Sequence, residues 1–114
     1  MSENVRVFTA ENWEQEVLKS AEPVLVDFWA EWCPPCRALA PSVESLATNY
    51  RGRVKVGKLN VDDAGDVAGR YGITSIPTLL VFRGGKIVDQ RVGALPLSEL
   101  ARFVDPHAGV PAQP

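Results

Sequence analysis

A run of six residues at positions 24–29 constrains the fold of this chain more than any other segment. It reads Val-Leu-Val-Asp-Phe-Trp, and all of its side chains except the aspartate are apolar. Such a run is typical of a strand that is buried on both faces of a sheet, and a second run of this kind occupies 78–82. Because a sheet buried on both faces needs helices on both sides, these runs predict an α/β protein.

The rest of the chain alternates between strand and helix patterns. Apolar runs predict three further strands, at 5–8, 54–60 and 86–92. Capping residues and apolar faces predict four helices, at 9–20, 33–50, 62–71 and 96–104. Thr9 is the expected cap of the first helix, and Asp62 or Asp63 of the third. Gly84-Gly85 is a hairpin signal, so the order predicts a mostly parallel sheet with an antiparallel edge.

Length and composition limit the domain organisation and the class of partner. The 114 residues fit one domain, placed at 1–105, followed at 106–114 by a proline-rich tail that we expect to be flexible. The net charge of −2 and the lack of a basic stripe argue against a nucleic-acid partner. The N-terminus lacks the pattern of a signal peptide, and the longest apolar run, at 76–82, is too short to cross a bilayer. We therefore expect a cytoplasmic protein without a membrane partner.

The only two cysteines, Cys33 and Cys36, stand three positions apart at the expected start of a helix. Their Cα atoms should lie about 5 Å apart, within the range of a disulfide, so the pair can act as a reversible dithiol centre. The helix N-terminus lowers the pKa of a thiol, which makes Cys33 the expected nucleophile. Pro34 and Pro35 have no N–H group, so Cys36 is the backbone donor left in this turn. Cys36, expected to be more buried, would resolve the mixed disulfide.

Two other interpretations of the cysteine pair stay open at this point. The first is a pair of buried free thiols without redox chemistry. The second is half of a zinc site, for which the chain offers only His107 as a further typical ligand although zinc usually takes four ligands. The dithiol interpretation needs no metal and no bound organic cofactor, because the sulfur atoms themselves carry the electrons.

Asp27 is an acid within an otherwise apolar strand. Burial would raise its pKa, so that it could exchange a proton with Cys36 through a water molecule near neutral pH. The alternative is an aspartate that faces solvent at the end of the strand. Lys58 would tune Asp27 if their two strands are neighbours, and is otherwise a solvated charge. Pro77, before the strand at 78–82, would form a tight turn if its peptide bond is cis, although trans is the common state.

Four segments of the chain resemble the active-site region and the conserved turns of the thioredoxin family. They are residues 26–37, 58–62, 71–78 and 92–94, and the resemblance covers about residues 4–104. It implies the thioredoxin fold, a five-stranded mixed sheet flanked by four helices, and the activity of a protein disulfide reductase. It also implies a cis Pro77 beside the cysteines, Cys33 as the attacking thiol, Cys36 as the resolving thiol, and Asp27 with its neighbour Lys58 as the proton-handling pair.

The resemblance further implies a docking surface and a set of partners. Backbone groups of Ile76 would pair with an extended client segment. The apolar residues of the docking surface would be Trp32, Pro34, Val61, Ile76, Val92, Gly93 and Ala94. The partners would be proteins that contain disulfides and a flavin-containing thioredoxin reductase that uses NADPH, with the chain itself a monomer.

Two positions depart from the usual pattern of the family. Pro34 stands where glycine is usual, which removes a donor and a flexible joint, so we expect a shifted reduction potential. Arg37 stands where lysine is frequent, so the positive charge is kept. The competing functions are an oxidant or isomerase of the same fold that works outside the cytoplasm, and a binding module in which redox cycling is incidental.

Overall fold

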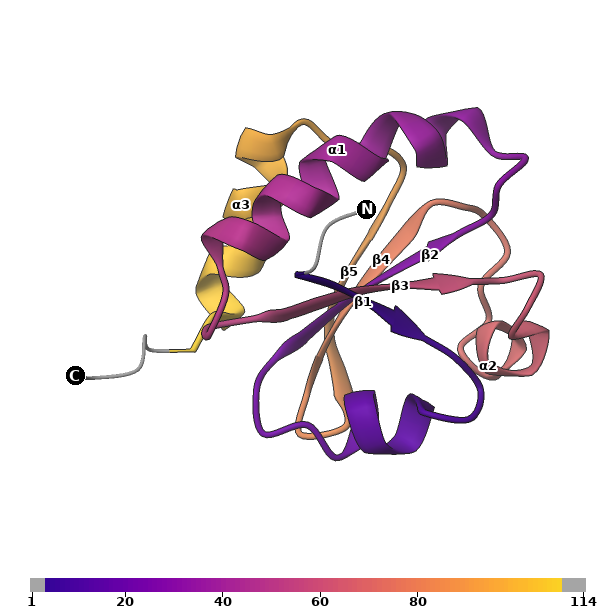
Figure 1. Ribbon diagram of the computed structural model, residues 1–114, viewed down its shortest axis with the longest axis horizontal. Coiled ribbons are helices and arrows are strands. Elements are labelled where there is room, and N and C mark those ends of the chain that lie inside the picture. The colour runs from indigo at the N-terminus through magenta and orange to yellow at the C-terminus, as the bar shows by residue number, and fades with distance from the viewer. Residues whose placement is uncertain (1–3, 110–114) are drawn as a thin grey trace.

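The computed structural model describes residues 4–109, which form one five-stranded sheet in the order β1-β3-β2-β4-β5 (Figure 1). The strands are β1 (Val5–Phe8), β2 (Val24–Trp29), β3 (Lys55–Asn60), β4 (Thr78–Arg83) and β5 (Lys86–Val92). All five predicted strands are confirmed, with bounds that differ by no more than one residue at either end. The two apolar runs become β2 and β4, which lie side by side in the middle of the sheet.

The direction of β4 corrects the predicted sheet. β1 and β2 both pair in parallel with β3, whereas β4 is antiparallel to β2 and β5 is antiparallel to β4. The antiparallel pairing thus begins inside the sheet and not only at its edge. The connection after β3, residues 61–77, stays at the end of the sheet at which β3 ends and does not cross back over it. The chain therefore enters β4 from the end of the sheet at which it left β3.

Helices cover both faces of the sheet (Figure 1). They are a short π-helical segment (Glu14–Leu18), α1 (Pro34–Asn49), α2 (Gly65–Arg70) and α3 (Leu97–Val104). Leu25 and Leu79 pack beneath α1 and α3 in one core cluster. Val26 and Phe28 pack in a second cluster with the Glu14–Leu18 segment and α2. Alternate side chains of β2 thus enter opposite cores, as expected for a strand between two helical layers.

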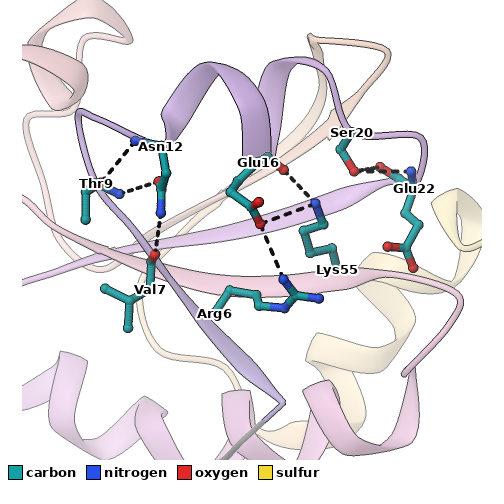
Figure 2. A network of polar contacts seen from close by, with 8 residues as sticks. All are labelled: Arg6, Val7, Thr9, Asn12, Glu16, Ser20, Glu22 and Lys55. Atoms are coloured by element: carbon teal, nitrogen blue, oxygen red, sulfur yellow. Dashed lines mark hydrogen bonds and ion pairs between the residues drawn. The ribbon is translucent and has the colours of Figure 1, made fainter.

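The predicted first helix, 9–20, is regular only over Glu14–Leu18. Before it, Thr9 and Asn12 exchange hydrogen bonds, each backbone N–H donating to the side-chain oxygen of the other residue at 2.8 and 3.1 Å (Figure 2). Thr9 therefore caps a turn and not the helix itself. After it, the Ser20 hydroxyl accepts from the N–H of Glu22 and donates to its carbonyl oxygen, which ends the segment in a second tight turn.

Polar contacts hold this short segment against the edge of the sheet. Lys55 of β3 donates from Nζ to the carbonyl oxygen of Glu16 at 2.9 Å and lies 3.6 Å from its carboxylate (Figure 2). Arg6 of β1 reaches the same carboxylate at 3.4 Å. These contacts join the segment to β1 and β3.

The predicted caps of the third helix are wrong. α2 begins after Ala64, and no side chain in the described part of the chain caps it. Asp62 instead donates its backbone N–H to Asn60 Oδ1 at 2.9 Å. This local turn occupies the residues that would otherwise form the first helical turn, which delays the helix by about three residues.

Within residues 4–109, no helix combines the length and the hydrophobicity needed to span a bilayer.

The segment after α3 stays in contact with the domain as far as it is described. Asp105–His107 form a 3₁₀ turn, in which Asp105 accepts a hydrogen bond from the Tyr50 hydroxyl. His107 Nε2 lies 2.9 Å from Asp89 Oδ2 of β5, and the N–H of Gly109 donates to the carbonyl of Arg53. These contacts bind residues 105–109 to the domain. The division at residue 105 stays a prediction, and residues 1–3 and 110–114 lie outside the described residues.

Candidate active site

Cys33 lies directly before α1 as its N-cap residue, after the turn that follows β2. The Cα atoms of Cys33 and Cys36 are 5.2 Å apart, as the helical spacing predicted, and their sulfur atoms are joined in a disulfide. Among residues 4–109, no cluster of side chains suited to a metal ion is found, and His107, in the turn after α3, contacts Asp89 of β5. The described residues therefore offer no third ligand within the same chain, so a zinc site would need a second copy of it.

The sulfur of Cys33 accepts a hydrogen bond from the backbone N–H of Cys36 at 3.2 Å. This is the donor that the two prolines left available, so the predicted contact is confirmed. The carbonyl oxygen of Ile76 lies 3.7 Å from the same sulfur. Cys33 and Cys36 are 4% and 2% exposed, so the expected difference in burial is small in the disulfide form.

Asp27 is 1% exposed, which excludes the alternative of a solvent-facing aspartate. Leu25 of the same strand packs beneath α1, and side chains two positions apart in a strand share a face. The Asp27 carboxyl group therefore points to the face covered by α1, the helix whose first turn contains Cys36. Burial raises the pKa of Asp27 from 3.8 to about 7, although the positive charge of Lys58 acts in the opposite direction. Its Oδ1 atom has no hydrogen-bond partner among the described residues.

Lys58 lies opposite Asp27 in the parallel pairing of β2 with β3, so the expected neighbourhood of the two residues is confirmed. Lys58 Nζ lies 4.1 Å from the centroid of the Trp29 ring. Both side chains line a surface cavity of about 320 Å³, which brings solvent to the residue beside Asp27. A buried carboxyl group that titrates near neutral pH, next to a lysine that water can reach, is suited to proton exchange.

A comparison with known proteins decides the family. The family model described as thioredoxin matches residues 4–106. The chain belongs to the thioredoxin family. It is 52% identical to "Thioredoxin" from Chlorobaculum thiosulfatiphilum over 101 residues, which is 89% of this chain and 94% of the relative. It is 48% identical to "Thioredoxin" from Pseudomonas aeruginosa over 105 residues, 92% of this chain and 97% of the relative.

Membership confirms the fold and the reaction class that the resemblance implied. The five-stranded mixed sheet with helices on both faces is the thioredoxin fold. The spacing of Cys33 and Cys36 after Trp32 fits the active-site motif of the family. The chain is a thiol–disulfide oxidoreductase that reduces protein disulfides by dithiol–disulfide exchange.

The residues expected to form the docking surface lie around the disulfide but differ in exposure. Val61 and Ile76 are half-buried and pack against the two cysteines. Trp32 and Val92 are 65% and 56% exposed. Pro34 and Ala94 are also exposed, whereas Gly93 is half-buried. Both aromatic and aliphatic surface is thus presented beside the buried sulfur atoms.

Pro77 follows a cis peptide bond, as the resemblance implied and against the common state of such bonds. The side chain of Pro77 is buried, so only the backbone beside it can contribute to a contact surface. The carbonyl of Pro77 accepts a hydrogen bond from the N–H of Gly93 at 2.9 Å. This bond joins the turn after β5 to the turn before β4, whose Ile76 carbonyl lies near the sulfur of Cys33.

Two contacts near the cysteines were not predicted. Trp32 donates from Nε1 to Asp62 Oδ2 at 2.8 Å, although Asp62 was expected to cap a helix. Arg37 donates from Nη1 to the carbonyl oxygen of Glu31 at 2.8 Å, although only its charge was considered. No pattern in the sequence pairs residues 30 positions apart. No local pattern in the sequence indicates either contact.

Proposed function

We propose that the chain reduces disulfides of client proteins with Cys33 as nucleophile, Cys36 as resolving thiol and Asp27 as the group that moves the proton. The observation that carries this proposal is the contact of Cys36 N–H with the Cys33 sulfur at the start of α1, 3.2 Å long. A donor at this point and the positive end of the helix dipole both favour a thiolate over a thiol.

In the first step, the Cys33 thiolate attacks one sulfur of the client disulfide. A bond forms between Cys33 and that sulfur, the client's sulfur–sulfur bond breaks, and the other client sulfur leaves as a thiolate that takes a proton from solvent. The exposed Trp32 and Val92 beside the centre support docking of an apolar client surface. Pro34, Val61, Gly93 and Ala94 would complete this surface, and backbone groups of Ile76 would pair with the client segment.

In the second step, Cys36 transfers its proton to Asp27 through a water molecule and attacks the sulfur of Cys33. The bond between Cys33 and Cys36 forms, the bond to the client breaks, and the client leaves with its second thiolate. A pKa of about 7 lets Asp27 accept this proton at neutral pH and later release it. Lys58, at the solvent-facing cavity, favours the ionised carboxylate that accepts the proton.

Two electrons then have to return to the disulfide. We propose that a flavin-containing thioredoxin reductase supplies them from NADPH, so that the chain itself binds no cofactor. We also propose that the protein works as a monomer in the cytoplasm, where the electron supply keeps the pair reduced. The disulfide form and the dithiol form would alternate during turnover.

Serine substitutions test the two sulfur roles with insulin as the client, NADPH and a thioredoxin reductase. Cys33→Ser should lose insulin reduction completely, and a variant that still reduces insulin would remove Cys33 as the nucleophile. Cys36→Ser should form a lasting mixed disulfide with a client, visible as an added mass. The double serine variant, which has neither sulfur, distinguishes an oxidoreductase from a pure binding module. A binding module would keep its biological role in this variant, whereas an oxidoreductase would lose it.

A further inference from the structure

Arg37 of α1 makes two hydrogen bonds to the loop that carries Cys33, in addition to the bond from the N–H of Cys36 to the Cys33 sulfur. Its Nη1 atom donates to the carbonyl oxygen of Glu31 at 2.8 Å. Its backbone N–H donates to the carbonyl oxygen of Cys33 at 3.1 Å. Arg37 therefore bonds the loop on both sides of Trp32, once with its side chain and once with its main chain.

The double proline explains why a side chain makes the first of these contacts. Pro34 and Pro35 have no N–H group, and the N–H of Cys36 is bonded to the sulfur of Cys33. None of these three main-chain positions at the start of α1 can therefore bond the carbonyl of Glu31. The guanidinium group of an arginine has five donors, so it can bind this carbonyl while its charge stays at the surface.

We propose that Arg37 is a positioning residue for disulfide exchange, because its bond to Glu31 holds Cys33 within reach of Cys36 when no covalent bond joins their sulfur atoms. In the disulfide form the two sulfur atoms hold each other in place. In the dithiol and in the mixed disulfide only the loop contacts do so. Loosening the loop lowers the effective concentration of one sulfur at the other and slows ring closure. This proposal rests on the roles proposed above for Cys33 and Cys36.

If replacing Arg37 slows disulfide exchange, the loss of its positive charge is a competing explanation to the loss of its bond to Glu31. A cation near the start of α1 stabilises the thiolate of Cys33 whether or not the cation is hydrogen-bonded to the loop. An exposed charge acts through solvent and is screened at high salt, where the Debye length falls to about 3 Å at 1 M. A contact that holds the loop in place persists under these conditions. Salt dependence therefore separates the two explanations.

The test uses the full reduced chain and 5,5′-dithiobis(2-nitrobenzoate) in a stopped-flow instrument. The Cys33 thiolate displaces one nitrothiobenzoate ion and forms a mixed disulfide with the other half of the reagent. Cys36, after passing its proton through water to Asp27, attacks the Cys33 sulfur and displaces the second ion. The rate of this second release, followed by absorbance, measures ring closure directly.

We expect Arg37→Ala to slow the second release about three- to tenfold, at both 0.05 M and 1 M KCl. Arg51→Ala is the matched control, because it removes an exposed arginine beyond the other end of α1 and should leave the rate unchanged. An unchanged rate in Arg37→Ala, or a slower rate that recovers in 1 M KCl, would overturn the proposal.

The same experiment distinguishes a failure of this proposal from a failure of the sulfur roles. The unaltered chain should release two equivalents of the coloured ion, and Cys36→Ser only one. A single equivalent from the unaltered chain would count against the two-thiol mechanism itself. A normal pair of releases with no effect of Arg37 would count only against the positioning role.

Discussion

At the scale of single residues, Asp27 is the group whose surroundings alter its chemistry most. It lies in β2 with 1% of its surface exposed, one oxygen without a hydrogen-bond partner in residues 4–109, and a pKa raised to about 7 by burial. An ordinary carboxyl group is fully ionised at pH 7 and is a weak base there. Burial therefore makes Asp27 a strong enough base to accept the proton of a thiol near neutral pH.

Replacement of Asp27 by asparagine should slow the resolving step most strongly near pH 7. A thiol with the ordinary pKa of 8.5 is only about 3% ionised at pH 7, so without a base the step should slow by up to about 30-fold. Above pH 9 the solvent removes the proton, and the two proteins should become equally fast. The rate of insulin reduction between pH 6 and 10 checks this, with the exposed Asp66→Asn as control. A constant ratio across this range would remove Asp27 from proton transfer.

The reactive residues could be predicted from the sequence because each breaks a local pattern. Asp27 is an acid in an apolar strand, and Cys33 and Cys36 have the spacing of one helical turn. The contacts of Trp32 with Asp62 and of Arg37 with Glu31 could not be predicted in the same way. Both contacts depend on how the loops pack, which the local pattern of apolar and polar residues does not indicate.

At the scale of elements, the first turn of α1 determines the properties of the centre. It supplies one N–H donor to the sulfur of Cys33, where glycine at position 34 would supply a second donor and a flexible joint. The balance between the disulfide and the dithiol depends on how well this turn fits each form. A change of 30 mV in the potential corresponds to about 1.4 kcal/mol, which one contact can supply.

We expect Pro34→Gly to move the reduction potential toward about −270 mV, the value known for thioredoxins. The physical reason is that the added N–H group and the freer joint restore the turn that is usual in the family. Equilibration with glutathione, followed by thiol trapping, measures the potential. Pro41→Ala, a proline of the same helix away from the cysteines, is the control. An unchanged reduction potential in Pro34→Gly would mean that the double proline has no effect on the potential.

Elements with strong local signals were predicted well, and elements shaped by packing were not. β2 and α1 follow the predicted ranges, because an apolar run and a long apolar helical face leave few alternatives. The Glu14–Leu18 segment is shorter than predicted because side-chain hydrogen bonds form separate turns before it and after it. The antiparallel entry of β4 depends on whether the chain between β3 and β4 crosses back over the sheet, and local sequence patterns do not indicate this.

At the scale of the whole molecule, the buried acid links activity to stability. The unfolded chain ionises Asp27 at its ordinary pKa of 3.8, whereas the folded protein keeps the proton until about pH 7. A raised carboxyl pKa means that folding binds a proton between these two values. The free energy of unfolding should therefore be highest at acidic pH and fall as the pH rises from about 4 to 7.

Asp27→Asn should remove this pH dependence, because the amide resembles the neutral acid and never ionises. Above pH 7 the variant should be more stable than the unaltered chain by about 4 kcal/mol, an order of magnitude that follows from the two pKa values. At pH 4 the two proteins should be nearly equal. Urea unfolding curves of the disulfide forms at pH 4, 6 and 8 measure the difference. Equal stability at pH 8 would mean that Asp27 is not buried as a neutral acid.

The central claim is that Cys33 is ionised at neutral pH and is the sulfur that attacks. The most direct measurement is the pH dependence of iodoacetamide alkylation of the reduced chain, with mass spectrometry to identify the modified cysteine. We expect modification at Cys33 first, with a midpoint below the ordinary thiol pKa of 8.5 because Cys36 N–H and the helix N-terminus favour the thiolate. Preferential modification of Cys36, or a reaction that begins only above pH 8.5, would contradict the account.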